Sequence, residues 1–269
     1  MTEPSENKKI LDKMTPEHYI FRGFVRVCSV CGYGVLENLP TNEQITEFYN
    51  RQFWKLNLCN DRVAQATKGV HSPVHLARAK RQFEFIAHYQ AIEGIQCCLE
   101  IGPGDALLSL ELKKNASKNT VFDLCEPGES WLPYYAKKGL NKVADFFPFT
   151  SSLKYDLIVA SHWLEHIPKV EAVFEALSGM LSDHGVVMIE IPNTAHDYWE
   201  LPIKDTPHIH FFTLASLKRY AEQNRFKVLA IEEFGITMAD YCAGQLPDYE
   251  TLGPSAGGYS VAAILSKQH

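Results

Sequence analysis

From residue 95 onward, short apolar runs alternate with segments in which apolar residues recur every three or four positions. The short runs predict buried strands, and the three-to-four spacing predicts amphipathic helices. Regular alternation of this kind indicates a mainly parallel sheet with helices on both faces, a doubly wound α/β fold. The expected strands are 96–101, 120–125, 142–146, 155–160, 185–191, 226–234 and 258–266, and the expected helices are 106–114, 128–138, 168–181 and 213–224.

The last two predicted strands have no helical pattern between them. Parallel neighbours need a crossover, whereas antiparallel neighbours need only a loop. We therefore expect a seven-stranded sheet that ends in an antiparallel hairpin at one edge.

The first part of the chain has a different pattern. Residues 1–20 have weak helical character, and residues 21–36 alternate and turn at glycines like a small hairpin. Thr41 and Gln44 form a capping-box pattern, which predicts a helix through about residue 54. A polar connection is expected over 58–73 and a one-faced helix over 74–92. We divide the chain into a tail, hairpin and helical cap over 1–73 and an α/β domain over 74–269.

Composition narrows the class of protein. The formal net charge is −6, which argues against a nucleic-acid-binding surface. No apolar run is long enough to span a membrane, and the polar start of the chain does not resemble a signal peptide. Seven cysteines in mostly apolar surroundings indicate a reducing compartment, so we expect a cytoplasmic protein. Cys97, Cys98 and Cys125 are expected to pack as small hydrophobic side chains within strands.

The most informative local pattern follows the strand at 96–101. Glu100 lies near the strand end, and Gly102 and Gly104 allow the backbone to approach a ligand closely. Ala106 occupies the place of the third glycine in a phosphate-binding loop. A carboxylate before the glycines suits a ligand with ammonium or hydroxyl groups better than a pyrophosphate. Glu126 similarly ends the next strand, just before Pro127.

A second group of polar residues follows the strand at 155–160. His162, Glu165 and His166 are spaced i, i+3 and i+4, so a helical turn would bring them together. They lie after the carboxyl end of a strand, where open α/β sheets bind ligands. Histidine suits proton transfer near neutral pH, so these three are the candidate catalytic residues.

These segments together resemble the class I S-adenosylmethionine-dependent methyltransferases over residues 74–266. The matching segments are 100–106, 126–128, 155–161, 164–166, 181–193 and 208–213, in the order of that family. The resemblance implies a Rossmann-like methyltransferase fold, S-adenosylmethionine as cofactor and a small-molecule acceptor.

The resemblance also implies roles for the cofactor-binding residues. Glu100, Gly102 and Gly104 would lie at the methionine end, with Arg78 or Arg81 as a partner for the carboxylate. Glu126 next to Pro127 would bind the ribose hydroxyls, with Asp123 as its rival. The remaining expected contacts are Asp145 and Phe146 at the adenine and Ser161 and His162 at the sulfonium.

The acceptor is less well defined. We expect methylation of a hydroxyl oxygen in a sugar or natural-product intermediate, with carbon and nitrogen left open. A metal-free cluster is the preferred interpretation. The alternative, suggested by relatives with a Glu-x-x-Glu-His segment, is a divalent metal such as Fe, Mn, Co or Zn. Its ligands would come from His162, Glu165, His166, His208 and His210. A further alternative is a catalytically silent methyltransferase-fold partner protein.

Three further segments are candidates for a role at the site. Cys28 and Cys31 resemble half of a zinc knuckle, and we expect a metal-free remnant because Cys59 and His71 are poorly spaced to complete it. The loops 193–212 and 236–258 are candidate walls of the acceptor site. The oligomeric state does not follow from these patterns.

Overall fold

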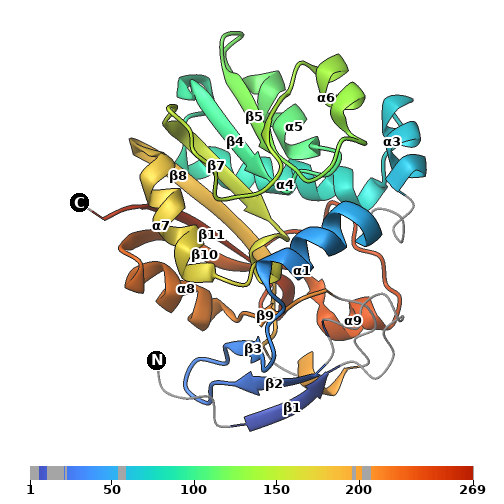
Figure 1. The fold of residues 1–269 in the computed structure, drawn as a ribbon, viewed down its shortest axis with the longest axis vertical. Helices are drawn as coiled ribbons and strands as arrows, with labels where there is room; N and C mark the ends of the chain where they lie inside the picture. Colours follow the sequence, from blue (N-terminus) through green and yellow to red (C-terminus); the bar gives the residue numbers. More distant parts are fainter. Residues whose placement is uncertain are drawn as a thin grey trace.

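The computed structural model describes residues 6–10, 21, 23–53, 59–195, 198–201 and 207–268, and only the backbone at 6–10, 51–53 and 59–60. Its main sheet has seven strands in the order β10-β11-β8-β7-β4-β5-β6 (Figure 1). The strands are β4 (Cys97–Ile101), β5 (Val121–Cys125), β6 (Asn141–Ala144), β7 (Tyr155–Ser161), β8 (Leu181–Pro192), β10 (Phe226–Thr237) and β11 (Gly258–Lys267). The predicted doubly wound α/β fold is confirmed.

The direction of the strands also follows the prediction. β4 pairs in parallel with both β5 and β7, and β6 and β8 extend the sheet in parallel on the two sides. β11 is antiparallel to β8 and β10, so the terminal hairpin lies at the sheet edge. The chain crosses from one half of the sheet to the other after β6, so the switch point lies between the neighbouring strands β4 and β7. Such a switch point opens a crevice at the carboxyl ends of the strands.

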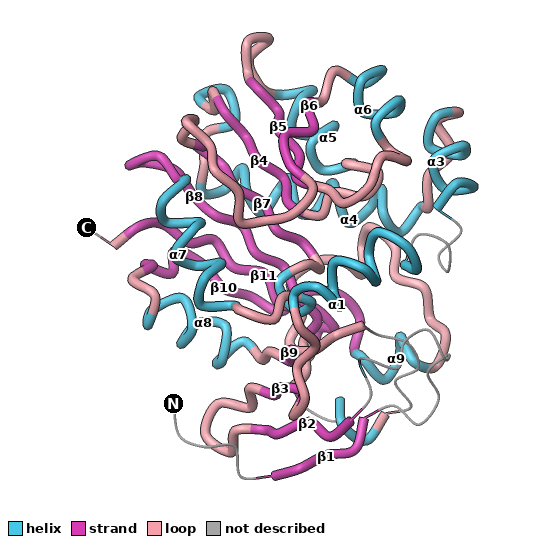
Figure 2. Tube along the Cα trace, viewed as in Figure 1, coloured by secondary structure: helices cyan, strands magenta, loops and turns pink. Residues whose placement is uncertain are grey.

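Helices cover both faces of this sheet (Figures 1 and 2). α4 (Pro73–Tyr89), α5 (Leu107–Asn115) and α6 (Leu132–Lys138) pack on one face, and α7 (Val170–Met180) and α8 (Leu214–Gln223) pack on the other. Strand β7 shows why its sequence is a continuous apolar run. Leu157 and Val159 pack in the core under α4, α5 and α6, and Ile158 and Ala160 pack in the core under α7 and α8. A strand buried on both faces has no polar alternation.

A second, antiparallel sheet contains β1 (Glu6–Ile10), β2 (Gly23–Val27), β3 (Gly34–Leu36) and β9 (His210–Phe211) in that order. β2 and β3 confirm the hairpin predicted at 21–36. The helical character predicted for the tail is wrong at 6–10, where pairing with β2 supplies the hydrogen bonds of a strand. β9 joins this sheet from far along the chain, which places His210 beside the N-terminal hairpin.

The segment before α4 forms helices along much of its length. α1 (Asn42–Glu47) begins with the Thr41–Gln44 capping box, as predicted, and continues into the π-helical turn η2 (Phe48–Phe53). α3 (Cys59–Thr67) replaces much of the polar connection predicted over 58–73. The remaining short helices are η3 (Ile92–Gly94), η4 (Leu164–His166), η5 (Tyr198–Glu200) and α9 (Met238–Cys242).

Two boundaries near the site differ from the pattern. β6 ends at Ala144, so Asp145 and Phe146 lie in the following loop. α6 begins at Leu132 because Gly128, with φ 75°, continues the turn after β5. The division of the chain at residue 73 stays a prediction. Within the described residues, no helix is long and apolar enough to cross a membrane.

Candidate functional site

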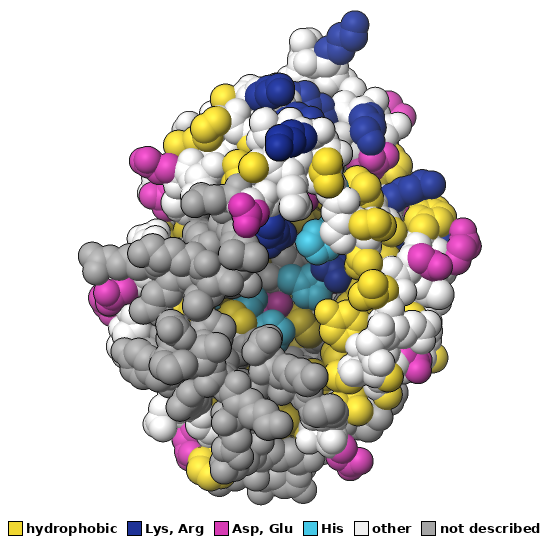
Figure 3. Space-filling model, turned by 90° about the vertical axis from the view of Figure 1, so that its right-hand side faces the viewer, with side chains coloured by type: hydrophobic (Ala, Val, Ile, Leu, Met, Phe, Trp, Pro, Cys, Tyr) yellow, Lys and Arg dark blue, Asp and Glu magenta, His cyan; other side chains and the backbone are white. Residues whose placement is uncertain are grey.

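A cavity of about 330 Å³ opens at the carboxyl ends of β4, β5 and β7. Figure 3 shows this hollow with histidine and basic side chains inside it, and the basic residues that line the cavity are Arg62 and Arg78. It is lined by all nine residues expected at a cofactor: Glu100, Gly102, Gly104, Glu126, Pro127, Asp145, Phe146, Ser161 and His162. His166 also lines it, whereas Glu165 is buried behind the histidines with 1% exposure.

The loop after β4 forms the floor of the cavity. Gly102 and Gly104 have φ angles of 68° and 54°, in the region that favours glycine. A Cβ atom on Gly102 would lie 3.0 Å from the ring of Trp163, so this position also needs the small residue. Ala106 has φ 52°, which explains why glycine is common at this position in related loops. The hydroxyl of Tyr135 donates to the Gly104 carbonyl at 2.5 Å and holds the loop, a contact not predicted from the sequence.

Glu100 lies beneath this loop and is 6% exposed. Its carboxylate accepts hydrogen bonds from the Ser109 N–H at 3.1 Å and the Ser109 hydroxyl at 2.5 Å. Burial raises the pKa of Glu100 to about 7, although the Ser109 hydrogen bonds oppose the shift. Glu100 thus fixes the start of α5 and keeps a titratable carboxyl at the cavity wall.

Glu126 reaches the cavity from the end of β5. Its carboxylate accepts the Gly104 N–H at 3.3 Å, and burial raises the pKa of Glu126 to about 8. Asp123, its rival in the sequence, lies elsewhere and accepts from the Tyr155 hydroxyl at 2.8 Å and from Asn141 Nδ2 at 2.9 Å. The structure brings Glu126 into the cavity, and Asp123 acts as a core hydrogen-bond acceptor.

The loop that follows β6 supplies another wall of the cavity. The Asp145 side chain is 61% exposed and pairs with Lys142 Nζ at 2.5 Å. Phe146 lines the cavity beside Phe147, an aromatic neighbour that the sequence pattern did not single out. This wall therefore has one carboxylate and two aromatic rings at the end of β6.

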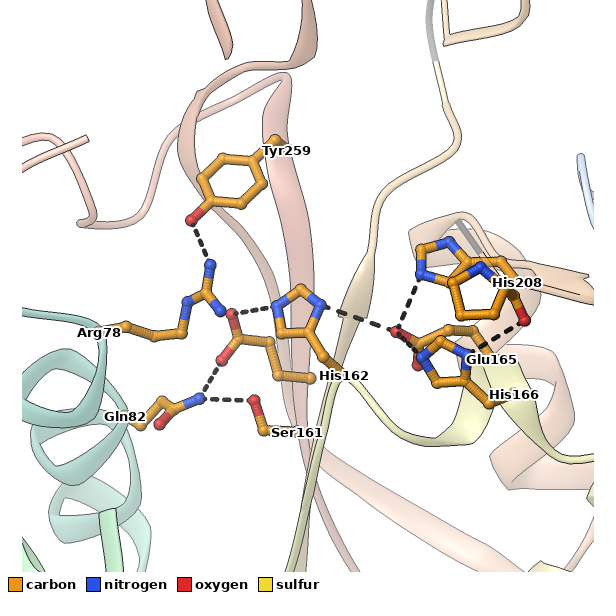
Figure 4. Close-up of polar contacts among 10 residues, drawn as sticks. Arg78, Gln82, Ser161, His162, Glu165, His166, His208 and Tyr259 are labelled. Carbon is orange, nitrogen blue, oxygen red and sulfur yellow. Dashed lines mark hydrogen bonds and ion pairs between the residues drawn. The ribbon is translucent and has the colours of Figure 1, made fainter. Parts of the chain in front are cut away.

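Ser161 and His162 end β7 and join a polar network (Figure 4). Gln82 Nε2 donates to Ser161 Oγ at 2.8 Å and to Glu190 Oε2 at 2.5 Å. His162 Nε2 lies 3.5 Å from Glu190 Oε1. Glu190 was missed in the sequence, although a carboxylate inside the apolar run of β8 was a readable signal because buried acids need partners.

Arg78 lies next to this network on α4 and lines the cavity. It donates from Nη2 to the Tyr259 hydroxyl at 2.9 Å, and its buried Nε has no hydrogen-bond partner. Arg81, the other candidate from the sequence, instead bonds the Tyr249 carbonyl and Glu84. The structure thus directs Arg78, and not Arg81, toward the ligand space.

The histidine cluster is built by a tight turn after β7. His162 has a left-handed backbone with φ 49°, and its N–H donates to the Glu190 carbonyl at 2.7 Å. Backbone strain of this kind concentrates at functional sites. η4 follows and carries Glu165 and His166, while the Ile209 N–H bonds the Glu165 carbonyl at 3.0 Å and brings His208 alongside.

Three histidines surround one oxygen of Glu165 (Figure 4). The distances to Oε1 are 3.7 Å from His162 Nδ1, 3.6 Å from His166 Nε2 and 3.7 Å from His208 Nε2. Burial lowers the pKa of His166 and His208. Burial and the Arg78 charge oppose protonation of His162, but Glu165 and Glu190 outweigh them and raise its pKa.

His210 lies apart from this cluster. Its Nδ1 is 2.5 Å from the Tyr33 hydroxyl, and its ring stacks on Tyr33. Glu165, His166 and His208 place one donor atom each within 4.8 Å of one another, the only such group among the side chains that the structure describes. Of the five candidate metal ligands, Glu165, His166 and His208 therefore lie together, and His210 lies apart from them.

The other candidate segments lie around this site. Tyr49 from η2 and Ile45 from α1 line the cavity. In the 193–212 loop, Tyr198 is buried near Phe211, while His196 and Pro202 lie outside the described residues. In the 236–258 segment, Tyr241 stacks on the ring of Tyr259. Cys28 and Cys31, neither of which is in a disulfide, lie at the turn between β2 and β3.

The strand order and the cavity at the switch point define a class I methyltransferase. The chain belongs to the methyltransferase domain family, whose model matches residues 76–231. A search of curated proteins gave no significant match.

Solved structures share the fold at low sequence identity. The DhpI–SAH complex is 14% identical with a TM-score of 0.55, and the match covers 85% of this chain and 99% of that chain. An S-adenosylmethionine-dependent methyltransferase from Clostridium acetobutylicum is 11% identical with a TM-score of 0.53, covering 80% and 100%. The mitomycin 7-O-methyltransferase MmcR is 11% identical with a TM-score of 0.53, covering 83% of this chain and 60% of that chain.

Proposed function

We propose that this chain transfers a methyl group from S-adenosylmethionine to a hydroxyl oxygen of a small molecule, such as a sugar or natural-product intermediate. The observation that carries the proposal is a single cavity with Glu126 on one wall and the His162–His166 pair on another. The fold is shared with DhpI, whose structure is an SAH complex, and with an O-methyltransferase of mitomycin.

The cavity has the groups that this cofactor needs. Glu126 accepts one hydrogen bond from Gly104, and its remaining acceptor capacity suits the two ribose hydroxyls. The buried Nε of Arg78 has no partner, which suits the carboxylate of the methionine end. Asp145 and Phe146 fit the amino group and the ring of the adenine. The residues present therefore fit S-adenosylmethionine.

The cofactor supplies a methyl group on a sulfonium sulfur, and the acceptor oxygen forms the new O–C bond while the S–C electron pair returns to sulfur. The chain must position the acceptor and remove its proton. His162 is placed for this second task because it lines the cavity beside the Ser161 end of β7. Glu165 and Glu190 lie on either side of its ring and would stabilise the imidazolium that forms. His166 lines the cavity on the far side of Glu165.

The proposal is tested first by calorimetric titration with SAH, and then by transfer of a labelled methyl group to a fractionated metabolite extract. We expect SAH to bind and one extract fraction to accept label. If label transfer is found, His162→Gln should lower kcat at least tenfold at saturating cofactor, and SAH titration of the variant separates this loss from any loss of cofactor binding. Failure of both cofactor forms to bind at millimolar concentration would overturn the proposal and favour a catalytically silent partner protein.

A further inference from the structure

The carboxylate of Glu165 is buried without a hydrogen bond. The side chain is 1% exposed, and neither Oε1 nor Oε2 has a hydrogen-bond partner. The three nearest imidazole nitrogens are 3.6–3.7 Å from Oε1, too far to donate a hydrogen bond. Glu165 therefore has ion-pair contacts to three imidazoles but no hydrogen bond to either oxygen. A buried carboxylate without hydrogen bonds is costly, so this arrangement points to a group that binds between these atoms.

The hydrogen bonding of His166 defines which of its nitrogens faces Glu165. His166 Nδ1 lies 3.2 Å from the Pro207 carbonyl, which can only accept, so Nδ1 carries the hydrogen. In the neutral ring Nε2 then presents a lone pair, and Nε2 is the atom 3.6 Å from Glu165 Oε1. Two electron-rich atoms thus face each other across a gap that a cation would bridge. Metal-binding histidines are commonly oriented by such a carbonyl on the other ring nitrogen.

The spacing of the donors fits coordination. Metal–nitrogen and metal–carboxylate bonds of about 2.1 Å at a tetrahedral angle separate two ligand atoms by about 3.4 Å. The observed distances of 3.6 Å and 3.7 Å from Glu165 Oε1 to His166 Nε2 and His208 Nε2 require only small side-chain movements. One carboxylate and two imidazoles form a recognised ligand set for divalent transition metals with open coordination positions.

We propose that Glu165, His166 and His208 form a binding site for one divalent transition metal ion, with an open position directed toward the cavity that His166 lines. The metal site is inferred from these distances and hydrogen bonds and does not depend on the proposed function. Its role rests on the proposed function: the ion would bind the acceptor's hydroxyl oxygen and lower its pKa. His162 is left beside the ion to take the proton, and His210 is excluded because it is paired with Tyr33.

The direct test is a titration of untagged, chelator-treated protein with Co²⁺, followed by visible absorption. We expect d–d bands that saturate at one ion per chain. Glu165→Gln and His208→Gln should weaken binding roughly 100-fold or more, since each removes a ligand. The control His184→Gln changes an exposed histidine on β8 and should leave affinity unchanged. Absent bands, or bands equally strong in both ligand variants, would overturn the site.

A second measurement, proton NMR, uses only the wild-type protein and so does not depend on whether a variant folds. Each histidine bound through Nε2 keeps a hydrogen on Nδ1, so proton NMR of the Co²⁺ protein should show two strongly shifted, exchangeable resonances. Loss of these signals in D₂O confirms their origin, and their absence would contradict a two-histidine site.

SAH titration of the same samples separates this inference from the proposed function. SAH binding without Co²⁺ binding overturns the metal site and leaves the methyltransferase proposal standing. Co²⁺ binding without SAH binding retains the site and removes the role assigned to it.

Discussion

Replacing Glu126 with alanine should selectively weaken cofactor binding. Glu126 is 2% exposed, lines the cavity and accepts one hydrogen bond, from the Gly104 N–H, so it keeps acceptor capacity for a ligand. Hydrogen bonds contribute about 0.5–1.5 kcal/mol each to a neutral acceptor and about 1.5–3 kcal/mol to a charged one. With the pKa of Glu126 raised to about 8, loss of its ribose contacts is expected to cost about 1–3 kcal/mol. That loss corresponds to an SAH dissociation constant raised about 5- to 150-fold.

Isothermal titration calorimetry measures this change, and two comparisons define its origin. 5′-Methylthioadenosine keeps the ribose and lacks the amino-acid part, so Glu126→Ala should weaken both ligands alike. Asp123→Asn should leave both affinities unchanged, because Asp123 bonds Tyr155 and Asn141 outside the cavity. Unchanged affinity in Glu126→Ala, with a loss in Asp123→Asn, would refute this assignment of the ribose-binding acid.

Three further predictions concern the same cavity. Arg78→Met should raise the SAH dissociation constant about tenfold in calorimetry and leave that of 5′-methylthioadenosine unchanged, whereas Arg81→Met should change neither; equal losses for both ligands would contradict a carboxylate contact. Gly102→Ala should lower the free energy of unfolding in urea by about 1–2 kcal/mol, because φ is 68° and Trp163 lies 3.0 Å from the added methyl; an unchanged midpoint would count against this loop geometry. The pKa of Glu100 is raised to about 7, so the native ligand-free protein binds more protons than the unfolded chain and its stability should fall as pH rises from about 4.5 to 7. Glu100→Gln should flatten this part of the pH profile in urea titrations, and an unchanged slope would contradict the buried, protonated carboxyl.

Much of the fold could be predicted because its signals are local. The run at β7 is continuous because one set of side chains packs under α4 and α5 and the alternate set packs under α7. The capping box of α1 is equally local, since it needs only Thr41 and Gln44. Element ends were less accurate because β8 starts directly where α7 ends, with no turn residue between them.

The candidate site was predictable only where its residues follow a strand end. Glu100 and Glu126 carry that signal, and both line the cavity. The hydrogen bonds of Gln82 to Ser161 and Glu190 cross 79 and 108 positions of the chain, so no sequence period reveals them.

The histidines show the same limit. His208 and His210 are two residues apart, yet one joins Glu165 and the other pairs with Tyr33 from the N-terminal hairpin. The packing of β9 against β3 contributes to this separation, and strand pairing across the whole chain is not encoded in local spacing.

The most direct test of the central claim is a calorimetric titration of the wild-type chain with SAH. Binding of one SAH per chain, weakened by Glu126→Ala, is the result expected of a methyltransferase built around this cavity. No heat of binding for SAH or S-adenosylmethionine up to millimolar concentration, in protein shown to be folded by circular dichroism, would contradict it.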